Sequence, residues 1–132
     1  MTNTNLKKLA EKEFERLMLQ DMDTSPGLGF EAAAFIARKH LDKERTKRAA
    51  EKACETYLRV FRSVHDEEIR QSLFNRLYPL SRIFQLEKVR DGITGLENRY
   101  ISYRYAYLTL PKEWFNPDFV HPELRGLYDA EL

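Results

Sequence analysis

Apolar residues recur at steps of three and four along most of this chain, which is the spacing of helices that bury one face. The first such segment covers residues 4–21, and its apolar face consists of Leu6, Leu9, Ala10, Phe14, Leu17 and Met18. Pro26, Gly27 and Gly29 then interrupt the pattern, because proline and glycine favour turns. We therefore predict a first helix over residues 4–21, followed by a connector.

The next two segments predict two further helices. Residues 30–40 are nearly all apolar and contain three consecutive alanines, which favours a short helix at the centre of the molecule. Asp42 can cap a longer helix over residues 43–62. The apolar stripe of that longer helix consists of Ala49, Ala50, Ala53, Cys54, Tyr57, Leu58 and Phe61. Its small residues would allow a neighbouring helix to approach closely.

A fourth helix is predicted to begin near Val64 with Ser63 as its cap. The apolar stripe of this helix consists of Ile69, Leu73, Phe74 and Leu77. Pro79 is expected to end or kink the helix, because proline has no amide hydrogen to donate. The helical pattern then resumes through Val89, and Gly92 stops it.

Residues 98–108, with the sequence NRYISYRYAYL, fit two different periods. A helix would bury Tyr100, Tyr103 and Tyr107 on one face and leave Arg104 and Tyr105 near the surface. The tyrosines also suit a strand, but no second stretch alternates for five residues, and a strand needs partners. We favour the helix and keep the strand open. Three interpretations of this segment stay open: its tyrosines pack in the core, contact another protein, or stack on nucleic-acid bases.

Residues 111–132 form an arm rich in aromatic residues and proline. Pro111 and Pro122 each suit the first position of a helix, which predicts helical turns over residues 112–115 and 123–128. The arm is too apolar for a free tail, so we expect it to pack across the bundle or onto a partner. Its apolar residues are Trp114, Phe115, Phe119, Val120, Leu124, Leu127 and Tyr128.

Together these segments predict an all-α fold with one domain over residues 1–132. An irregular bundle of four to five helices would fill residues 1–110, and the arm would pack across it. The 132 residues are enough to bury a core without a disulfide or a metal. We expect a cytoplasmic protein with no membrane partner, since no apolar run could span a bilayer and the lone Cys54 fits a reducing compartment.

The formal net charge of +1 lacks the global basic excess of a dedicated nucleic-acid binder. Charge is nevertheless uneven, because residues 38–52 carry many more cations than acids. This basic stretch consists of Arg38, Lys39, Lys43, Arg45, Lys47, Arg48 and Lys52. It is either a solvated helix face or a surface that meets phosphates.

The sequence contains no complete motif for a metal site or for a catalytic nucleophile. Asp21, Asp23 and Ser25 begin like a calcium loop, but proline and alanine stand where its glycine and its glutamate are needed. We therefore interpret the segment as a capped connector between helices. The three histidines share no metal-ligand spacing, and Cys54 lies on an apolar stripe that favours an inert thiol. We expect no metal and no cofactor.

Arg59 and His65, in the sequence RVFRSVH, resemble the R-x4–6-H motif of the HEPN ribonucleases. That family consists of small all-α bundles that cleave RNA as dimers, with the arginine and histidine meeting at the dimer cleft. The resemblance implies metal-independent acid–base chemistry on the ribose 2′-hydroxyl. This chain has Val60 where a polar residue commonly follows the arginine.

We expect a non-enzymatic protein that binds another macromolecule, most directly another protein, as an adaptor, inhibitor or assembly factor. The expected interface consists of Arg104, Tyr105, Trp114, Phe115, Phe119 and Tyr128. A nucleic-acid-binding regulator that uses the basic stretch is the alternative, and a HEPN-like ribonuclease is the second alternative. A homodimer stays open, although no heptad repeat supports one.

Overall fold

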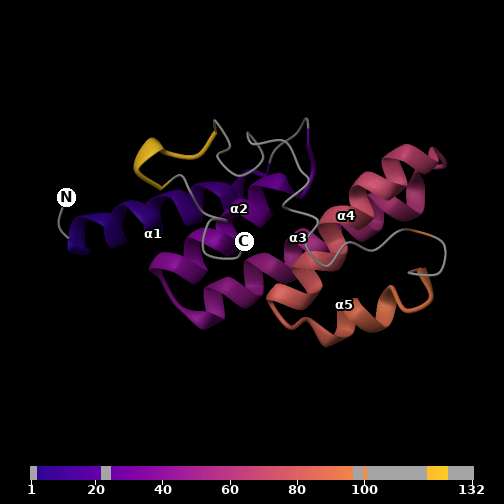
Figure 1. Cartoon of the computed structure of the whole chain (residues 1–132). Helices are drawn as coiled ribbons and strands as arrows, with labels where there is room; N and C mark the ends of the chain where they lie inside the picture. Colours follow the sequence, from indigo (N-terminus) through magenta and orange to yellow (C-terminus); the bar gives the residue numbers. More distant parts are fainter. Residues whose placement is uncertain (1–2, 22–24, 97–99, 101–118, 125–132) are drawn as a thin grey trace.

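The protein is represented by a computed structural model that describes residues 3–21, 25–96, 100 and 119–124 (Figure 1). Within these residues the fold is all-α and contains no strand, as predicted. The helices are α1 (Asn3–Leu19), α2 (Leu28–His40), α3 (Lys43–Ser63), α4 (Glu67–Ile83) and α5 (Glu87–Gly92). A short 3₁₀ helix, η4 (Pro122–Leu124), follows near the end of the chain.

Helix α2 is the centre of the bundle. It packs against α1 on one side and α3 on another, while α4 packs on α3, and α5 packs on both α4 and α3. Every residue from Glu31 to Ala37 is buried, which confirms the prediction of a central helix. The start of α1, the end of α2 and the start of α3 lie at the same end of the molecule (Figure 1).

The core follows the predicted stripes closely. Helix α3 buries its whole predicted stripe except Leu58, which is half-buried. The ring of Tyr100, also buried as predicted, lies 5.3 Å from the ring of Phe61 and 5.8 Å from that of Phe74 between centroids. Each such fully buried side chain contributes roughly 1.5–3 kcal/mol of hydrophobic stabilisation. Ile69 was assigned to the α4 stripe wrongly, because it is 48% exposed in the first turn.

Two helix starts show which side chains act as caps. Asp42 caps α3 as predicted, with its Oδ1 accepting a hydrogen bond from the Arg45 amide at 2.8 Å. Helix α4 begins at Glu67 and not near Val64, and its cap is Asp66, whose Oδ1 accepts from the Ile69 amide at 3.0 Å. Ser63 is instead the last residue of α3, and its hydroxyl donates to the Val60 carbonyl.

Pro79 was predicted to end or kink this helix, and the first of these is wrong, because α4 continues through Pro79 to Ile83. Proline removes the hydrogen bond that its own amide would make, and the ring of Pro79 is buried at that turn. The break comes at Phe84–Leu86, where Gln85 adopts a positive φ of 54°. The Leu86 amide donates to the Ser81 carbonyl at 2.9 Å, which closes α4 before α5 begins.

Residues 119–124 bring the end of the chain back onto α1 (Figure 1). Arg16 donates from Nη2 to the Phe119 carbonyl at 2.7 Å, and the His121 amide donates to Glu13 Oε2 at 3.2 Å. Val120 and Leu124 are buried. These six residues therefore pack on the bundle, as expected for part of the arm. Residues 101–118 and 125–132, including the turn expected over 112–115, lie outside the described residues.

No helix among the described residues is both long enough and apolar enough to cross a membrane.

Candidate functional site

The most deeply buried charged group among the described residues is the carboxylate of Glu31 on α2. Glu31 is 0% exposed. Its Oε1 accepts from the Tyr57 hydroxyl at 3.0 Å and from Arg76 Nε at 2.9 Å. Its Oε2 accepts from Arg76 Nη2. The bidentate contact with arginine is the strong, geometrically specific form of this ion pair. One carboxylate thus ties α2 to α3 and α4.

The connector before α2 packs against the Tyr57 ring of this cluster at Gly27. Gly27 has a φ of 95°, which side-chain-bearing residues rarely adopt. A Cβ placed there would lie 2.5 Å from Cε1 of Tyr57, so only glycine leaves room for the tyrosine ring. Asp21 fixes the connector, because its carboxylate accepts from the Gly27 amide at 2.6 Å and from the Phe30 amide at 3.2 Å.

The electrostatics of the cluster favour a fixed charge pair. Burial raises the pKa of Tyr57 well above its ordinary value, and the nearby Glu31 carboxylate raises it further. The tyrosine therefore stays a neutral donor to the carboxylate. Both Glu31 oxygens are occupied and the side chain has no exposed surface, so no substrate can reach it. We conclude that this cluster is an internal cross-link between helices.

Sequence reasoning missed this cluster by treating the carboxylates as members of solvated faces. A signal was present, because Glu31 is the only charged residue between Leu28 and Ala37. An acid within an apolar helix either finds a cation or loses its charge. Its partner, Arg76, is 45 positions away, and helical periodicity carries no information about that pairing.

The segment that resembles a calcium loop serves as the capped connector between helices. The Asp21 carboxylate caps the start of α2, as described above. Asp23 lies outside the described residues. Across the described part of the chain, no three His, Cys, Asp or Glu side chains gather as metal ligands would.

The structure brings the predicted basic stretch to one end of the molecule but turns its cations to different sides. The Arg38 guanidinium lies 5.5 Å from the Phe84 ring beyond the end of α4. The Arg48 guanidinium lies 5.5 Å from the Phe14 ring of α1, on another side. The Lys52 ammonium lies 5.3 Å from the ring of Phe30. Such cation–π contacts hold the charged groups in place while leaving them exposed.

The remaining cations of the stretch are also at the surface. Arg45 pairs with Asp42 at 3.6 Å and Lys47 with Glu51 at 3.9 Å, both in partly or fully exposed positions where such pairs contribute little. Lys39 and Lys43 are exposed, and neither has an ion-pair partner within the described ranges.

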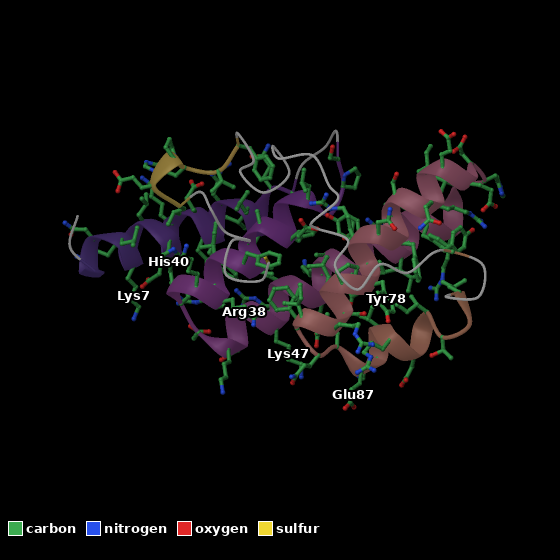
Figure 2. The ribbon with its side chains drawn as sticks, in the orientation of Figure 1. Lys7, Arg38, His40, Lys47, Tyr78 and Glu87 are labelled. Carbon is green, nitrogen blue, oxygen red and sulfur yellow. The ribbon has the colours of Figure 1, made fainter. Side chains whose placement is uncertain are left out.

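Helix packing adds α1 to this basic end. Exposed Lys7 and Lys8 lie in the first turns of α1, near the end of α2, and Figure 2 shows Lys7 and His40 at this end of the molecule. Burial lowers the pKa of His40, and the charge of Lys39 lowers it further, so His40 adds no charge at neutral pH. We call this end the basic pole and define it by Lys7, Lys8, Arg38, Lys39, Lys43, Arg45, Lys47 and Arg48.

Arg59 and His65, the residues of the HEPN-like motif, lie at the opposite end of α3. Both side chains are exposed, with Arg59 in the last part of the helix and His65 in the connector that follows it. The ribonuclease stays a prediction. Cys54 is buried, and burial followed by the charge of Glu31 raises its pKa, which fits the expected inert thiol.

Phe119 is the one member of the expected protein interface that the structure describes, and it is half-buried against the bundle. The other five expected residues lie outside the described ranges and stay predictions. They are Arg104, Tyr105, Trp114, Phe115 and Tyr128.

Comparison with known proteins found no matching family model, no matching curated protein and no matching solved structure.

Proposed function

We propose that the chain is a non-enzymatic binding protein whose basic pole docks an acidic surface of another protein. The observation that carries this proposal is that the start of α1, the end of α2 and the start of α3, which bear these surface cations, lie at one end of the bundle. Asp42, Glu44 and Glu51 are the acids among these cations, and they are outnumbered. An exposed surface with one dominant sign attracts a partner of the opposite sign and speeds their encounter.

Three features favour a protein partner over nucleic acid. Asp42 and Glu44 stand among the cations and would repel a phosphate backbone, whereas a protein can present both signs at matching points. The cations of the pole also face different directions, because Arg38 lies over the Phe84 ring and Arg48 over the Phe14 ring. Proteins that bind single-stranded nucleic acid instead present a charged groove that follows the backbone. The net charge of +1 points the same way.

The test is capture of host proteins on the immobilised full chain. Lys39→Glu together with Lys43→Glu reverses two exposed cations of the pole that have no ion-pair partner among the described residues. Arg59→Glu together with Arg62→Glu is the matched control, because it reverses two exposed cations at the other end of α3. Thermal unfolding of each variant establishes that it is folded.

The proposal predicts a protein that is retained by wild type and by the control, lost from the pole variant, and released by about 1 M salt. The lysate is treated with nuclease beforehand. If retention depends on nucleic acid, the nucleic-acid alternative is correct and the proposal is wrong. Equal retention by the pole variant and the control also contradicts it.

A further inference from the structure

A pocket of about 480 Å³ opens between the last turns of α4 and helix α5. Tyr78 and Arg82 line it from α4, and Glu87, Arg90 and Asp91 line it from α5. Figure 2 shows Tyr78 and Glu87 on these two helices. The buried residue Ile93 also lines the pocket. The volume lies within the range of roughly 300–1,000 Å³ that is typical of sites for small molecules.

The pocket is lined by cationic and anionic side chains that form no ion pair with another described residue. Among the described residues, Glu87, Arg90 and Asp91 form no ion pair. Arg82 contacts Tyr78, with Nη1 donating to the phenol oxygen at 3.2 Å and the guanidinium 5.6 Å from the ring centroid, and it forms no ion pair with another described residue. The ring therefore orients the Arg82 guanidinium without neutralising it.

Helix α5 carries features that are unfavourable for folding alone. It has six residues, which is too short to be stable by itself. Glu87 and Asp91 stand four positions apart, where like charges repel on a helix. Gln85, in the turn between α4 and α5, has a φ of 54°, a strained conformation for a residue other than glycine. Strain of this kind often marks a functional position.

We propose that this pocket binds a small zwitterion of the α-amino acid class. Its carboxylate would lie against Arg82 and Arg90, and its ammonium against Glu87 and Asp91. This arrangement would pair all four protein charges and relieve the repulsion between the two acids. A ligand with charge of only one sign would instead meet two protein groups of its own sign.

The test follows the amide signals of the isotope-labelled full chain by NMR while free L-amino acids are added singly. Succinate and 1,4-diaminobutane serve as probes that carry only negative or only positive charge. The expected result is that at least one amino acid shifts the signals of residues 78–94 with saturation, while neither single-sign probe does. Binding of succinate or the diamine alone overturns the proposal, and so does the absence of any saturable shift.

Substitutions then separate the two halves of the pocket. Arg90→Gln tests the carboxylate side and Glu87→Gln the ammonium side, and each is expected to weaken binding at least about tenfold. Lys88→Gln is the matched control, because Lys88 is exposed on α5 but does not line the pocket. Unchanged amide signals outside residues 78–94 establish that each variant is folded. Equal affinities for Lys88→Gln and both pocket variants overturn the proposal.

Discussion

Arg76 on α4 holds both carboxylate oxygens of Glu31 on α2, in a site where the Glu31 side chain has no exposed surface. The Tyr57 hydroxyl from α3 completes the contact. Because charges are costly to bury, the cluster stabilises the fold only while Glu31 keeps its contacts with Arg76 and Tyr57. It therefore fixes how three helices meet.

Glu31→Ala should lower the free energy of unfolding by about 3–5 kcal/mol, because it leaves a buried arginine without its carboxylate. Replacing both partners, with Glu31→Leu and Arg76→Met, should cost less than Glu31→Ala, since no charge is then buried. Urea unfolding followed by circular dichroism measures both. Glu55→Ala removes an exposed carboxylate from α3 and is the control, with an expected change within about 0.5 kcal/mol. A loss below about 1 kcal/mol for Glu31→Ala would show that the cross-link is unimportant.

Gly27→Ala and Gly95→Ala form a pair that separates backbone strain from crowding. Both glycines have φ near 95°, so alanine should cost about 1–2 kcal/mol at either site. Only at Gly27 would the new methyl group meet the Tyr57 ring, which should raise the loss there to about 2–4 kcal/mol. Among the described residues, no heavy atom beyond the chain neighbours of Gly95 lies within 4 Å of the corresponding position. Equal losses of unfolding free energy for the two variants would contradict the structure around Tyr57.

Glu13→Gln should loosen residues 119–124 from α1, because Glu13 accepts from both Arg16 and the His121 amide. The hydrogen bonds from Arg16 are the main reason that the pKa of Glu13 lies below its ordinary value of 4.5. A carboxyl group with a lowered folded-state pKa stabilises the fold above its unfolded-state pKa. That stabilisation is lost as the pH falls through the folded-state value.

The difference in stability between wild type and Glu13→Gln should therefore be about 1 kcal/mol at neutral pH and should shrink as the pH falls below 4.5. Urea unfolding at several pH values measures it. Glu15→Gln is the control on the exposed side of α1, and it should change little at any pH. A difference that stays constant down to strongly acidic pH would be inconsistent with the Glu13 contacts.

Asp66→Ala should cost about 1 kcal/mol, because it removes the cap of α4. Ser63→Ala should cost less, since the Ser63 hydroxyl only donates back to the Val60 carbonyl within its own helix. Thermal unfolding compares the two variants. A larger loss of stability for Ser63→Ala than for Asp66→Ala would indicate that Ser63 is the cap, as the sequence pattern predicted.

The helices could be predicted because their spacing is a local property. The start of α3 and its cap at Asp42 were predicted correctly, and the bounds of α1 and α2 were close. The errors came where two local signals compete. Ser63 and Asp66 are both good caps, and the extended backbone at Val64 decided in favour of Asp66. Pro79 can end a helix, but burial of its ring against the core outweighed one missing hydrogen bond.

The sites depended more on tertiary contacts than on sequence spacing. The basic stretch was recognisable from composition, but the direction of each cation is set by rings from other helices, as for Arg38 over Phe84. The Glu31–Arg76 pair required knowledge of which helices meet. The α4–α5 pocket arises from the turn at Gln85, which no pattern in the sequence indicated.

Whether the basic pole docks a partner protein is tested most directly by affinity. The protein captured on the immobilised chain is titrated against three forms of the chain. These are wild type, the Lys39→Glu/Lys43→Glu variant and the Arg59→Glu/Arg62→Glu control, each compared by calorimetry at low and high salt. We expect the pole variant to bind at least about tenfold more weakly than the control, and wild-type affinity to fall as salt rises. Equal affinity of the two variants, with no dependence on salt, would contradict a basic docking surface.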